Sequence, residues 1–403
     1  MSALTAKDFP GEDGREPGAP PGPASNASGK AKRYQRARLR LTLFGMALEL
    51  AALLFLLLSG GSVALRQLVV RQADWPPLQI LYYFVLLGLA WEALTGPLDY
   101  ARGYWLEHRY GLSNQTLRAW LWDEVKSLLV SGVLGLAVVE LVYGLLRAAG
   151  SNWWWIAALC LVLLMVVLAR LTPVVLLPLF YKTRPLDRPQ LKQRLLALAE
   201  RCGASVVDVF QLDLSAKSKA ANAALAGWGR TRRILLGDTL LSGYEEEEIE
   251  AVLAHELGHH HFAHLWKLMA LQSGIFFLGF YLADRFLAWG VGRFGFEGPG
   301  DPAAFPLLAL AFAALALVLL PLANGLSRGY ERQADRFAAE ATRGPGALIS
   351  ALRKLSRQNL ADPNPHPVVE LLFYSHPSIA RRITSLEQLE AASPDDEPMG
   401  TLN

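Results

Sequence analysis

The sequence predicts a mostly helical protein that crosses a membrane about six times. Hydrophobic residues make up 52% of its 403 residues and charged residues only 19%, whereas soluble proteins are about 45–50% apolar and about 25% charged. Six stretches are also apolar over roughly 20 residues, which is the length of helix that spans a bilayer. Each is expected to be a helix, because a lone strand cannot satisfy its backbone hydrogen bonds in lipid.

The orientation in the membrane follows from the basic residues before the first span. The predicted spans lie at 41–62, 78–97, 127–146, 153–178, 268–288 and 304–323. They are preceded by a basic cluster of the kind that stays in the cytoplasm, made of Lys30, Lys32, Arg33, Arg36, Arg38 and Arg40. Counting crossings from this cluster places three longer polar segments inside, namely 98–126, 179–267 and 324–403.

Residues 1–36 are expected to form a disordered arm. The run GREPGAPPGPASNASGK is rich in Pro, Gly, Ala and Ser and cannot bury a core. Three acids, Glu49, Glu92 and Glu140, fall inside predicted spans, where a charge is costly. A water-filled cavity around them and simple pairing or snorkelling are equally good interpretations.

The most informative motif is HELGH at residues 255–259, within a segment that should be helical. Two histidines four positions apart lie one turn apart on the same face of a helix, so both imidazoles can reach one metal ion. With Glu256 beside His255 and His259, this pattern is typical of zinc hydrolases. The alternative interpretation is a histidine-rich, solvated helix.

The start of this helix is also predicted from the sequence. Ser242 and Glu245 have the spacing of a capping box, and residues 245–248 are four acids in the first turn, where the helix dipole favours negative charge. The acidic run is therefore interpreted as a helix start rather than a metal site. The helix is expected to run on toward the fifth span.

A hydrolytic zinc site needs a third protein ligand and an open position for water. Cys160 and Cys202 do not form a zinc-type pair. A third histidine at the metzincin spacing is excluded, because that position is Leu265 and the glycine that should precede it is Phe262. The ligand must therefore come from another segment on the cytoplasmic side.

The sequence SRGYERQAD at 327–335 supplies a candidate third ligand. Glu331 and Asp335 lie one helical turn apart, and the hairpin of the fifth and sixth spans returns them to the side of His255. One carboxylate would complete the site for one zinc ion per chain, and the other would accept the free ring N–H of a ligand histidine. Alternatively, Glu331 pairs only with Arg328 or Arg332.

Glu256 is expected to be the general base of a peptide-bond hydrolase. Zinc lowers the pKa of water to about 7, and an adjacent carboxylate can take the proton as the water attacks a carbonyl. The same carboxyl group can then pass the proton to the leaving amine. The other histidines, His260, His261 and His264, are expected to lie behind the ligands or at the surface.

These residues resemble those of a known family, the CAAX prenyl proteases, which are integral-membrane zinc metallopeptidases. Beyond HELGH, the run EHRYGLSNQT at 107–116 resembles the family's cytoplasmic stretch, and PLFYKTRPL at 178–186 resembles its signature after the fourth span. The heat-shock membrane zinc peptidases are more distant. The resemblance covers about residues 40 to 390, although eukaryotic members have one more span than is predicted here.

The resemblance implies further site residues. Asn222 and Ala223, followed by GWG and RILLGDTL, resemble the family's strand pair ahead of the zinc helix, where an edge strand holds the substrate backbone. SHPSIARRI at 375–383 resembles a motif whose histidine and arginine, here His376 and Arg382, lie near the zinc and stabilise the oxyanion. Without the resemblance, the first segment is a short strand with a turn and the second a Pro-initiated helix with an exposed Arg-rich face.

The resemblance also implies the domain plan. A gluzincin-like zinc protease domain with a small β-sheet would lie on the cytoplasmic side of the membrane helices. We expect an N-terminal membrane region at 37–180, with four spans and a cytoplasmic loop. It would be followed by a peptidase region at 181–403 that holds the zinc helix, two further spans and the C-terminal segment. The acids in the spans would line the family's intramembrane chamber.

The predicted function is therefore that of an integral-membrane zinc endopeptidase of the CAAX prenyl protease type. Its partners would be a peptide or protein substrate, with or without a lipid group, and the lipid bilayer, with no nucleic acid. The Ala-, Leu- and Arg-rich composition favours a bacterial source and hence the inner membrane, with the active site on the cytoplasmic side. Quality control of membrane proteins is the alternative within this class. A catalytically silent scaffold is the alternative outside it.

Overall fold

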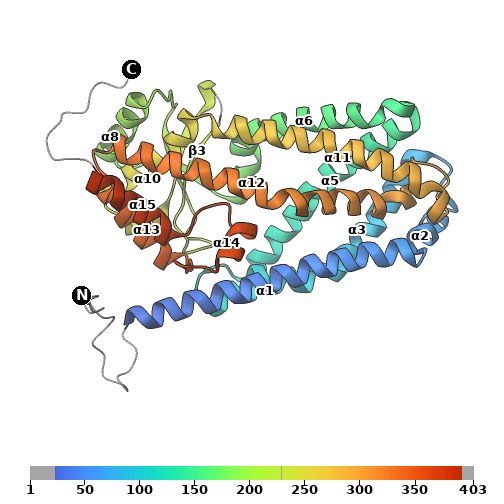
Figure 1. The fold of residues 1–403 in the computed structure, drawn as a ribbon, viewed down its shortest axis with the longest axis horizontal. Coiled ribbons are helices and arrows are strands. Elements are labelled where there is room, and N and C mark those ends of the chain that lie inside the picture. The colour runs from blue at the N-terminus through green and yellow to red at the C-terminus, as the bar shows by residue number, and fades with distance from the viewer. Residues whose placement is uncertain (1–22, 228, 393–403) are drawn as a thin grey trace, which may run out of the picture.

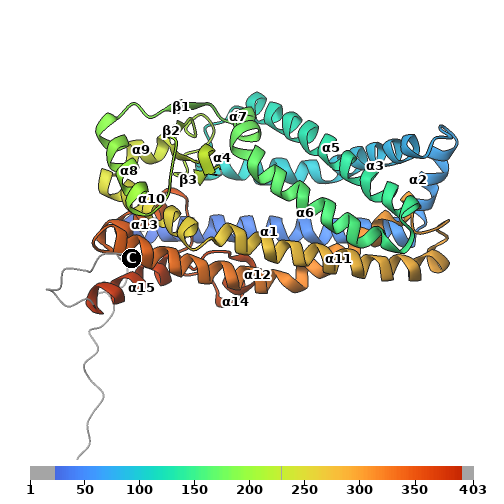
Figure 2. The same cartoon turned by 90° about the horizontal axis from the view of Figure 1, so that it is seen from above.

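The protein is elongated, with long helices running side by side along its length and a polar domain at one end (Figures 1 and 2). The structure is a computed structural model and describes residues 23–227 and 229–392. Within these ranges six helices are long and apolar enough to cross a membrane: Gly29–Leu58, Pro76–Tyr110, Leu117–Ala148, Gly150–Phe180, His264–Phe294 and Pro302–Ala341. Each overlaps one predicted span, so the predicted fold class is confirmed.

The membrane part contains nine helices of the described chain. These are α1 (Pro23–Leu58), α2 (Gly61–Val70), α3 (Pro76–Tyr100), α4 (Leu106–Tyr110), α5 (Leu117–Ala148), α6 (Trp153–Leu171), α7 (Leu177–Phe180), α11 (His264–Phe294) and α12 (Phe305–Ala341). Two π-helical turns, Ala101–Trp105 and Thr172–Leu176, join α3 to α4 and α6 to α7, so each pair forms one long rod.

The expected boundary of the N-terminal arm at residue 36 is wrong. Residues 1–22 lie outside the described part, but α1 already begins at Pro23. This part of the helix is held by packing: Tyr34 is 2% exposed, its ring lies tilted against that of Tyr110, and its hydroxyl donates a 2.6 Å hydrogen bond to Glu107. The composition of this segment does not predict the helix, because its contacts, including that of Gln35 with the carbonyl oxygen of Leu360, are made with residues distant in the sequence.

The polar domain is built on a four-stranded sheet with the order β1-β2-β4-β3. Its strands are β1 (Thr183–Pro185), β2 (Val209–Leu212), β3 (Ala223–Ala226) and β4 (Arg233–Gly237). β2 and β4 are parallel, while β1 and β3 pair antiparallel at the two edges. The predicted strand pair before the zinc-type helix is thus confirmed, and β3 is an edge strand that packs against α10.

Helices cover the sheet and form one apolar core with it. They are α8 (Pro189–Arg201), α9 (Asp238–Gly243), α10 (Glu246–His261), α13 (Gly346–Gln358), α14 (Pro367–Phe373) and α15 (Ile379–Ala392). Val209, Ile234 and Leu236 of the central strands are fully buried in this core with Leu253 and Leu257 of α10. The apolar side of α10 is therefore fixed, and its histidines contact α12, which packs beside it.

Two details of α10 differ from the prediction. The capping box is formed by Glu245 and Glu248, because Glu245 is the last extended residue, while Ser242 belongs to α9. The helix also does not run on into the fifth span. It ends at His261, and Ala263 adopts the left-handed conformation with φ 54° before α11 starts at His264.

Gly258 allows α10 and α12 to approach closely. A Cβ atom at this position would lie 3.0 Å from the Cα atom of Ala334 and 3.3 Å from its carbonyl oxygen. The close contact positions the face of α12 that carries Glu331 and Asp335 directly opposite the histidines of α10. Packing of backbone against backbone thus determines how near the carboxylates come.

The opposite end of the bundle is joined by buried polar contacts. Arg66 of α2 forms a 2.5 Å ion pair with Asp301, and their side chains are 9% and 1% exposed. Ser62 contacts the hydroxyl of Tyr83 and donates to the carbonyl oxygen of Ala303. These contacts tie α2 to the connection between α11 and α12, far along the molecule from α10 (Figure 1).

The acids predicted inside the spans have different surroundings. Glu92 is exposed on α3 and lines a cavity of about 290 Å³ whose other walls include Leu87, Trp91 and Phe305. Glu49 and Glu140 are half-buried on α1 and α5. A chamber lined by all three acids remains a prediction.

Candidate metal centre

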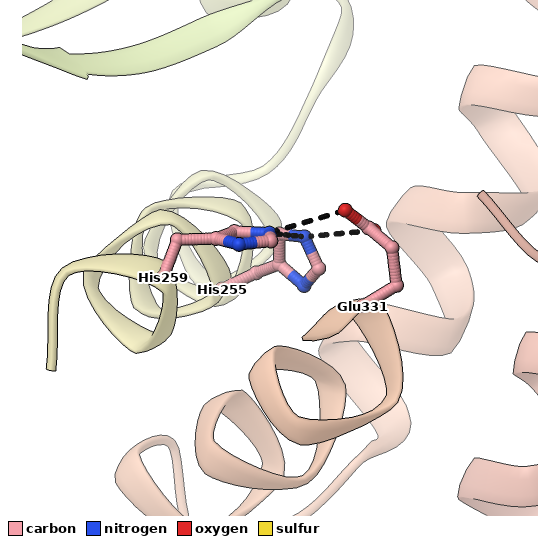
Figure 3. Close-up of side chains that lie close together, drawn as sticks. All are labelled: His255, His259 and Glu331. Carbon is pink, nitrogen blue, oxygen red and sulfur yellow. Dashed lines mark hydrogen bonds and ion pairs between the residues drawn. The ribbon is translucent and has the colours of Figure 1, made fainter. Parts of the chain in front are cut away.

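Two histidines and one carboxylate converge between α10 and α12 (Figure 3). The Nε2 atoms of His255 and His259 are 3.2 Å apart. Glu331 reaches toward both, with Oε2 at 3.3 Å from Nε2 of His255 and Oε1 at 3.2 Å from Nε2 of His259. The three potential ligand atoms lie within 4.8 Å of one another. The alternative that Glu331 pairs only with a neighbouring arginine of its own helix is therefore wrong.

The electrostatics of this cluster suit a cation. Glu331 is 3% exposed, and its Oε2 atom has no hydrogen-bond partner among the described residues. Burial opposes protonation of His255, but its contacts with Asp335 and Glu331 outweigh burial and raise its pKa to about 9. Two imidazole nitrogens and one carboxylate match the donor set of hydrolytic zinc sites, which keep a further position open.

Glu256 lies beside the cluster and shares a cavity with it. The cavity has a volume of about 130 Å³ and is lined by Glu256, His255, Glu331, His376 and Arg382, among others. Burial raises the pKa of Glu256, and the residue has no ion-pair partner among the described side chains. A carboxylate with these properties is free to exchange a proton with a molecule in the cavity.

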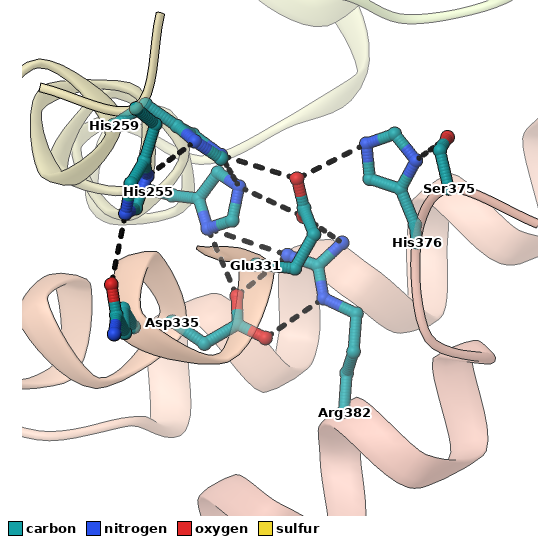
Figure 4. A network of polar contacts seen from close by, with 9 residues as sticks. His255, His259, Glu331, Asp335, Ser375, His376 and Arg382 are labelled. Atoms are coloured by element: carbon teal, nitrogen blue, oxygen red, sulfur yellow. Dashed lines mark hydrogen bonds and ion pairs between the residues drawn. The ribbon is translucent and has the colours of Figure 1, made fainter. Parts of the chain in front are cut away.

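Asp335 and Arg382 support His255 from behind (Figure 4). Oδ1 of Asp335 lies 2.9 Å from Nδ1 of His255, as was predicted for the second carboxylate of α12. Arg382 of α15 holds Asp335 with two hydrogen bonds, from Nε at 2.9 Å and from Nη2 at 2.6 Å. Because Nδ1 of His255 faces a carboxylate, the lone pair of Nε2 is directed into the cluster.

His376 approaches the cluster from the loop after α14. Its Nε2 atom lies 3.2 Å from Oε1 of Glu331, and its side chain is 59% exposed. The loop is fixed by Arg328, whose Nη1 donates to the carbonyl oxygens of Glu370 at 3.0 Å and of Tyr374 at 2.7 Å. The structure thus brings His376 and Arg382 to the site, as the sequence resemblance implied.

Asn222 and Ala223 line the same cavity as the cluster. Ala223 is the first residue of the edge strand β3, and the carbonyl oxygen of Asn222 accepts a 2.9 Å hydrogen bond from the backbone N–H of Gly237. One side of β3 is therefore paired with β4, and the other side is the outer edge of the sheet. Its position next to Glu256 is that expected of a backbone-binding strand.

From the sequence, His264 is expected to lie behind the ligands or at the surface, but neither the partners of His264 nor a wall of leucines in the cavity is predicted. His264 and Gln333 form a polar chain that contacts His259 from outside the cluster. Leu348, Leu352 and Leu355 of α13 form an apolar wall of the cavity. The spacing of the leucines at helical intervals is a signal for that wall, whereas nothing in the sequence places His264 against His259, because a helix break intervenes.

The fold and the site together define a membrane metallopeptidase, and comparison with known proteins gives the family. The chain belongs to peptidase family M48, whose model matches residues 185–390. A second model, the N-terminal region of CAAX prenyl proteases with five membrane helices, matches residues 25–182. In the described chain this region holds four long apolar helices and the short apolar helix α2.

Relatives of known name support the same conclusion. The chain is 30% identical to the metalloprotease YhfN of Bacillus subtilis, over 90% of this chain and 86% of that protein. It is 28% identical to CAAX prenyl protease 1 of Saccharomyces cerevisiae, over 89% and 85% of the two chains. The crystal structure of Ste24p from S. mikatae superposes with a TM-score of 0.80 at 26% identity, covering 90% of this chain and 89% of that one. The predicted family is confirmed, and the Bacillus relative agrees with the expected bacterial source.

Proposed function

We propose that this metalloprotease is a zinc endopeptidase that holds one zinc ion per chain with His255, His259 and Glu331. The observation that carries the proposal is the convergence of three potential ligand atoms within 4.8 Å, in the same cavity as Glu256. Bound zinc would act as a Lewis acid that polarises a carbonyl group and makes water acidic enough to lose a proton near neutral pH.

Glu256 would act as the general base and then as the general acid. Its carboxylate would take a proton from the attacking water and deliver it to the nitrogen of the leaving amine. The burial that raises its pKa favours both transfers, because a proton carrier works best when its pKa approaches the working pH. The absence of an ion-pair partner among the described side chains leaves the carboxylate able to turn toward substrate.

His376, Arg382 and Asp335 would have distinct roles around the substrate carbonyl. His376 is the accessible donor, since more than half of its side chain is exposed next to Glu331. A donor at this place stabilises the negative charge that develops on the carbonyl oxygen. The side chain of Arg382 is 10% exposed and is committed to Asp335, so it would contribute positive potential and, through Asp335, keep His255 in position.

The edge strand β3 would bind the substrate backbone by strand addition, with Asn222 and Ala223 in contact. The leucines of α13 would face a substrate side chain on the opposite wall of the cavity. Relatives bearing the name CAAX prenyl protease suggest CAAX-type peptides, with or without a lipid group, as the first substrates to test. The Bacillus relative is named only as a metalloprotease, so unmodified membrane proteins are the second class to test.

The proposal includes the orientation of the protein in the bacterial inner membrane. The basic cluster before the first span favours a cytoplasmic start of α1, and the polar domain at the same end of the molecule (Figure 1) would then also lie in the cytoplasm. The proposed boundary between the membrane region and the peptidase region lies near residue 180, where α7 ends and β1 follows.

Substitution of the proposed base tests the function directly. We expect Glu256→Gln to retain zinc and fold but to lower peptide cleavage by at least about a hundredfold, the usual contribution of a general base. Cleavage is measured with purified protein in detergent or liposomes, and zinc is measured by metal analysis of the same samples. Glu246→Gln, in the first turn of α10 and away from the cavity, is the matched control. Full activity of Glu256→Gln would refute the mechanism.

A further inference from the structure

His264 lies directly behind His259, on the side away from the proposed metal. Its Nδ1 atom is 3.0 Å from Nδ1 of His259, and its Nε2 atom is 2.9 Å from Oε1 of Gln333. The residue is only 1% exposed, and its ring stacks on Tyr330 at a centroid distance of 4.3 Å. Both ring nitrogens are therefore engaged, and the ring cannot turn without breaking this packing.

The break between α10 and α11 creates this contact. In a continuous helix, residues five positions apart lie on different faces, since each residue advances about 100°. Ala263 interrupts the helix with its left-handed backbone, at φ 54°, and the first turn of α11 brings His264 back against His259. A strained non-glycine residue at this point is held by the packing of its surroundings.

The hydrogen-bond chain has only one direction that is compatible with metal binding. An amide oxygen only accepts, so Oε1 of Gln333 requires the proton of a neutral His264 to be on Nε2. Nδ1 of His264 is then an acceptor, so Nδ1 of His259 must donate. The proton of His259 is thus on Nδ1, and the lone pair of Nε2 faces His255 and Glu331.

We propose that His264 and Gln333 are positioning residues that hold His259 in its metal-binding tautomer. Asp335 orients His255 in the same way, because its Oδ1 atom lies 2.9 Å from Nδ1 of His255. The two ligand histidines are thus oriented by different chemistry, one by a carboxylate and one by a neutral imidazole–amide chain. This inference rests on the proposed metal site and assigns a role to residues outside its ligand set.

The test is zinc affinity, measured by chelator competition on the purified full-length protein. Loss of an outer partner of a ligand histidine costs 10–100-fold in metal affinity. We expect a loss of about this size for His264→Leu, and near wild-type affinity for His264→Asn, because the amide oxygen of Asn can replace Nδ1 as the acceptor. The control is His261→Leu, which should leave zinc affinity unchanged. His261 is exposed and takes no part in the hydrogen-bond chain of His259, His264 and Gln333.

Gln333 gives an independent test if His264→Leu does not fold. Gln333→Glu should keep zinc affinity at or above the wild-type value, because a carboxylate accepts the hydrogen bond from Nε2 of His264. Gln333→Met should lower zinc affinity, because its side chain lacks such an oxygen acceptor. Because the two residues act in series, the double variant His264→Leu with Gln333→Met should bind zinc no more weakly than His264→Leu alone. The inference is overturned if His264→Leu or Gln333→Met binds zinc like the wild type, or if their losses add in full.

The same titrations separate this inference from the proposed function. Cobalt-loaded samples provide a second readout, because the visible spectrum of the ion reports its coordination without any substrate. A wild-type protein that binds no zinc would refute the proposed metal site itself. A wild-type protein that binds zinc, with unaffected His264 and Gln333 variants, would refute only the positioning role.

Discussion

At the residue scale, the neighbours of the two histidines of the site determine which ring nitrogen of each carries the proton. Asp335 and His264 contact the outer nitrogens of His255 and His259, so both inner nitrogens are directed at Glu331. Glu331 adds negative charge in a buried position where one of its oxygens has no hydrogen-bond partner among the described residues. A buried carboxylate is costly unless it is paired with positive charge, which Arg382 at 3.7 Å supplies in part and a metal ion would supply more fully.

Glu248 gives a residue-scale prediction that concerns stability and its dependence on pH. Its carboxylate is 4% exposed, accepts from the backbone N–H of Glu245, and contacts Ser350 and Lys354 of α13. Burial opposes its ionisation, but these partners outweigh burial and lower its pKa. Its stabilising effect is therefore complete above the unfolded pKa of about 4.3 and is lost as the pH falls through the lower folded pKa.

We expect Glu248→Gln to lower the free energy of unfolding by about 1–2 kcal/mol at pH 7. The difference from the wild type should shrink as the pH falls below about 4. Thermal unfolding in detergent at several pH values measures both effects. Glu246→Gln, in the same helical turn but paired only with exposed Arg194, is the control and should cost less than about 0.5 kcal/mol. A difference that grows at low pH would contradict this account.

At the element scale, the contact between α10 and α12 builds the site. The contact is close because Gly258 has no side chain where Ala334 passes, so Glu331 and Asp335 on α12 come within reach of α10. The same long helix holds the loop of His376 through Arg328. One membrane helix thus carries the third proposed ligand, the partner of His255 and the residue that holds the loop of His376.

Substitution of Gly258 tests this contact. We expect Gly258→Ala to destabilise the fold by about 1–3 kcal/mol, because the added methyl group would force two backbones apart. Zinc affinity should fall as well, since the separation moves Glu331 away from the histidines. Gly274→Ala in α11, where a Cβ atom meets nothing within 4 Å, is the matched control. Unchanged stability and zinc affinity in Gly258→Ala would refute the role of close packing.

The sequence predicts most of the helices of this protein, but not where they break or which of their ends are buried. The six spans and the HELGH helix follow from hydropathy and periodicity, and the return of α12 beside α10 follows from counting crossings. The capping box was placed three residues too early, because Ser242 fits the pattern but belongs to α9. The break at Ala263 and the buried start of α1 depend on tertiary packing, which local sequence patterns do not contain.

At the scale of the whole molecule, the two ends of the bundle are stabilised separately. The proposed metal centre lies between α10 and α12 at the polar end, and the Arg66–Asp301 ion pair joins α2 to the connection before α12 at the other end (Figure 2). Asp301 also accepts from the backbone N–H groups of Glu297 and Ala303. If this buried carboxylate lost its charge, Arg66 would keep only its contact with the exposed Glu297.

We expect Asp301→Asn to lower the free energy of unfolding by about 3 kcal/mol, because it removes the only buried carboxylate that pairs with Arg66 among the described residues. Zinc affinity should not change, since the substitution lies far from α10. Unfolding in detergent and zinc titration of the same samples check the two statements. Glu297→Gln is the control, because Glu297 contacts the same Arg66 at 3.2 Å but has a side chain that is 75% exposed. Loss of zinc binding in Asp301→Asn would contradict the separation of the two ends.

The central claim is that two helices of this membrane protein, α10 and α12, share one zinc ion. Zinc titration of purified wild-type protein and Glu331→Gln, with X-ray absorption spectra of the loaded wild type, tests it most directly. We expect one zinc per wild-type chain, bound by two imidazoles and a carboxylate, and at least about tenfold weaker binding in a folded Glu331→Gln. Unchanged zinc affinity in Glu331→Gln, or a wild-type spectrum without two imidazoles, would contradict the account.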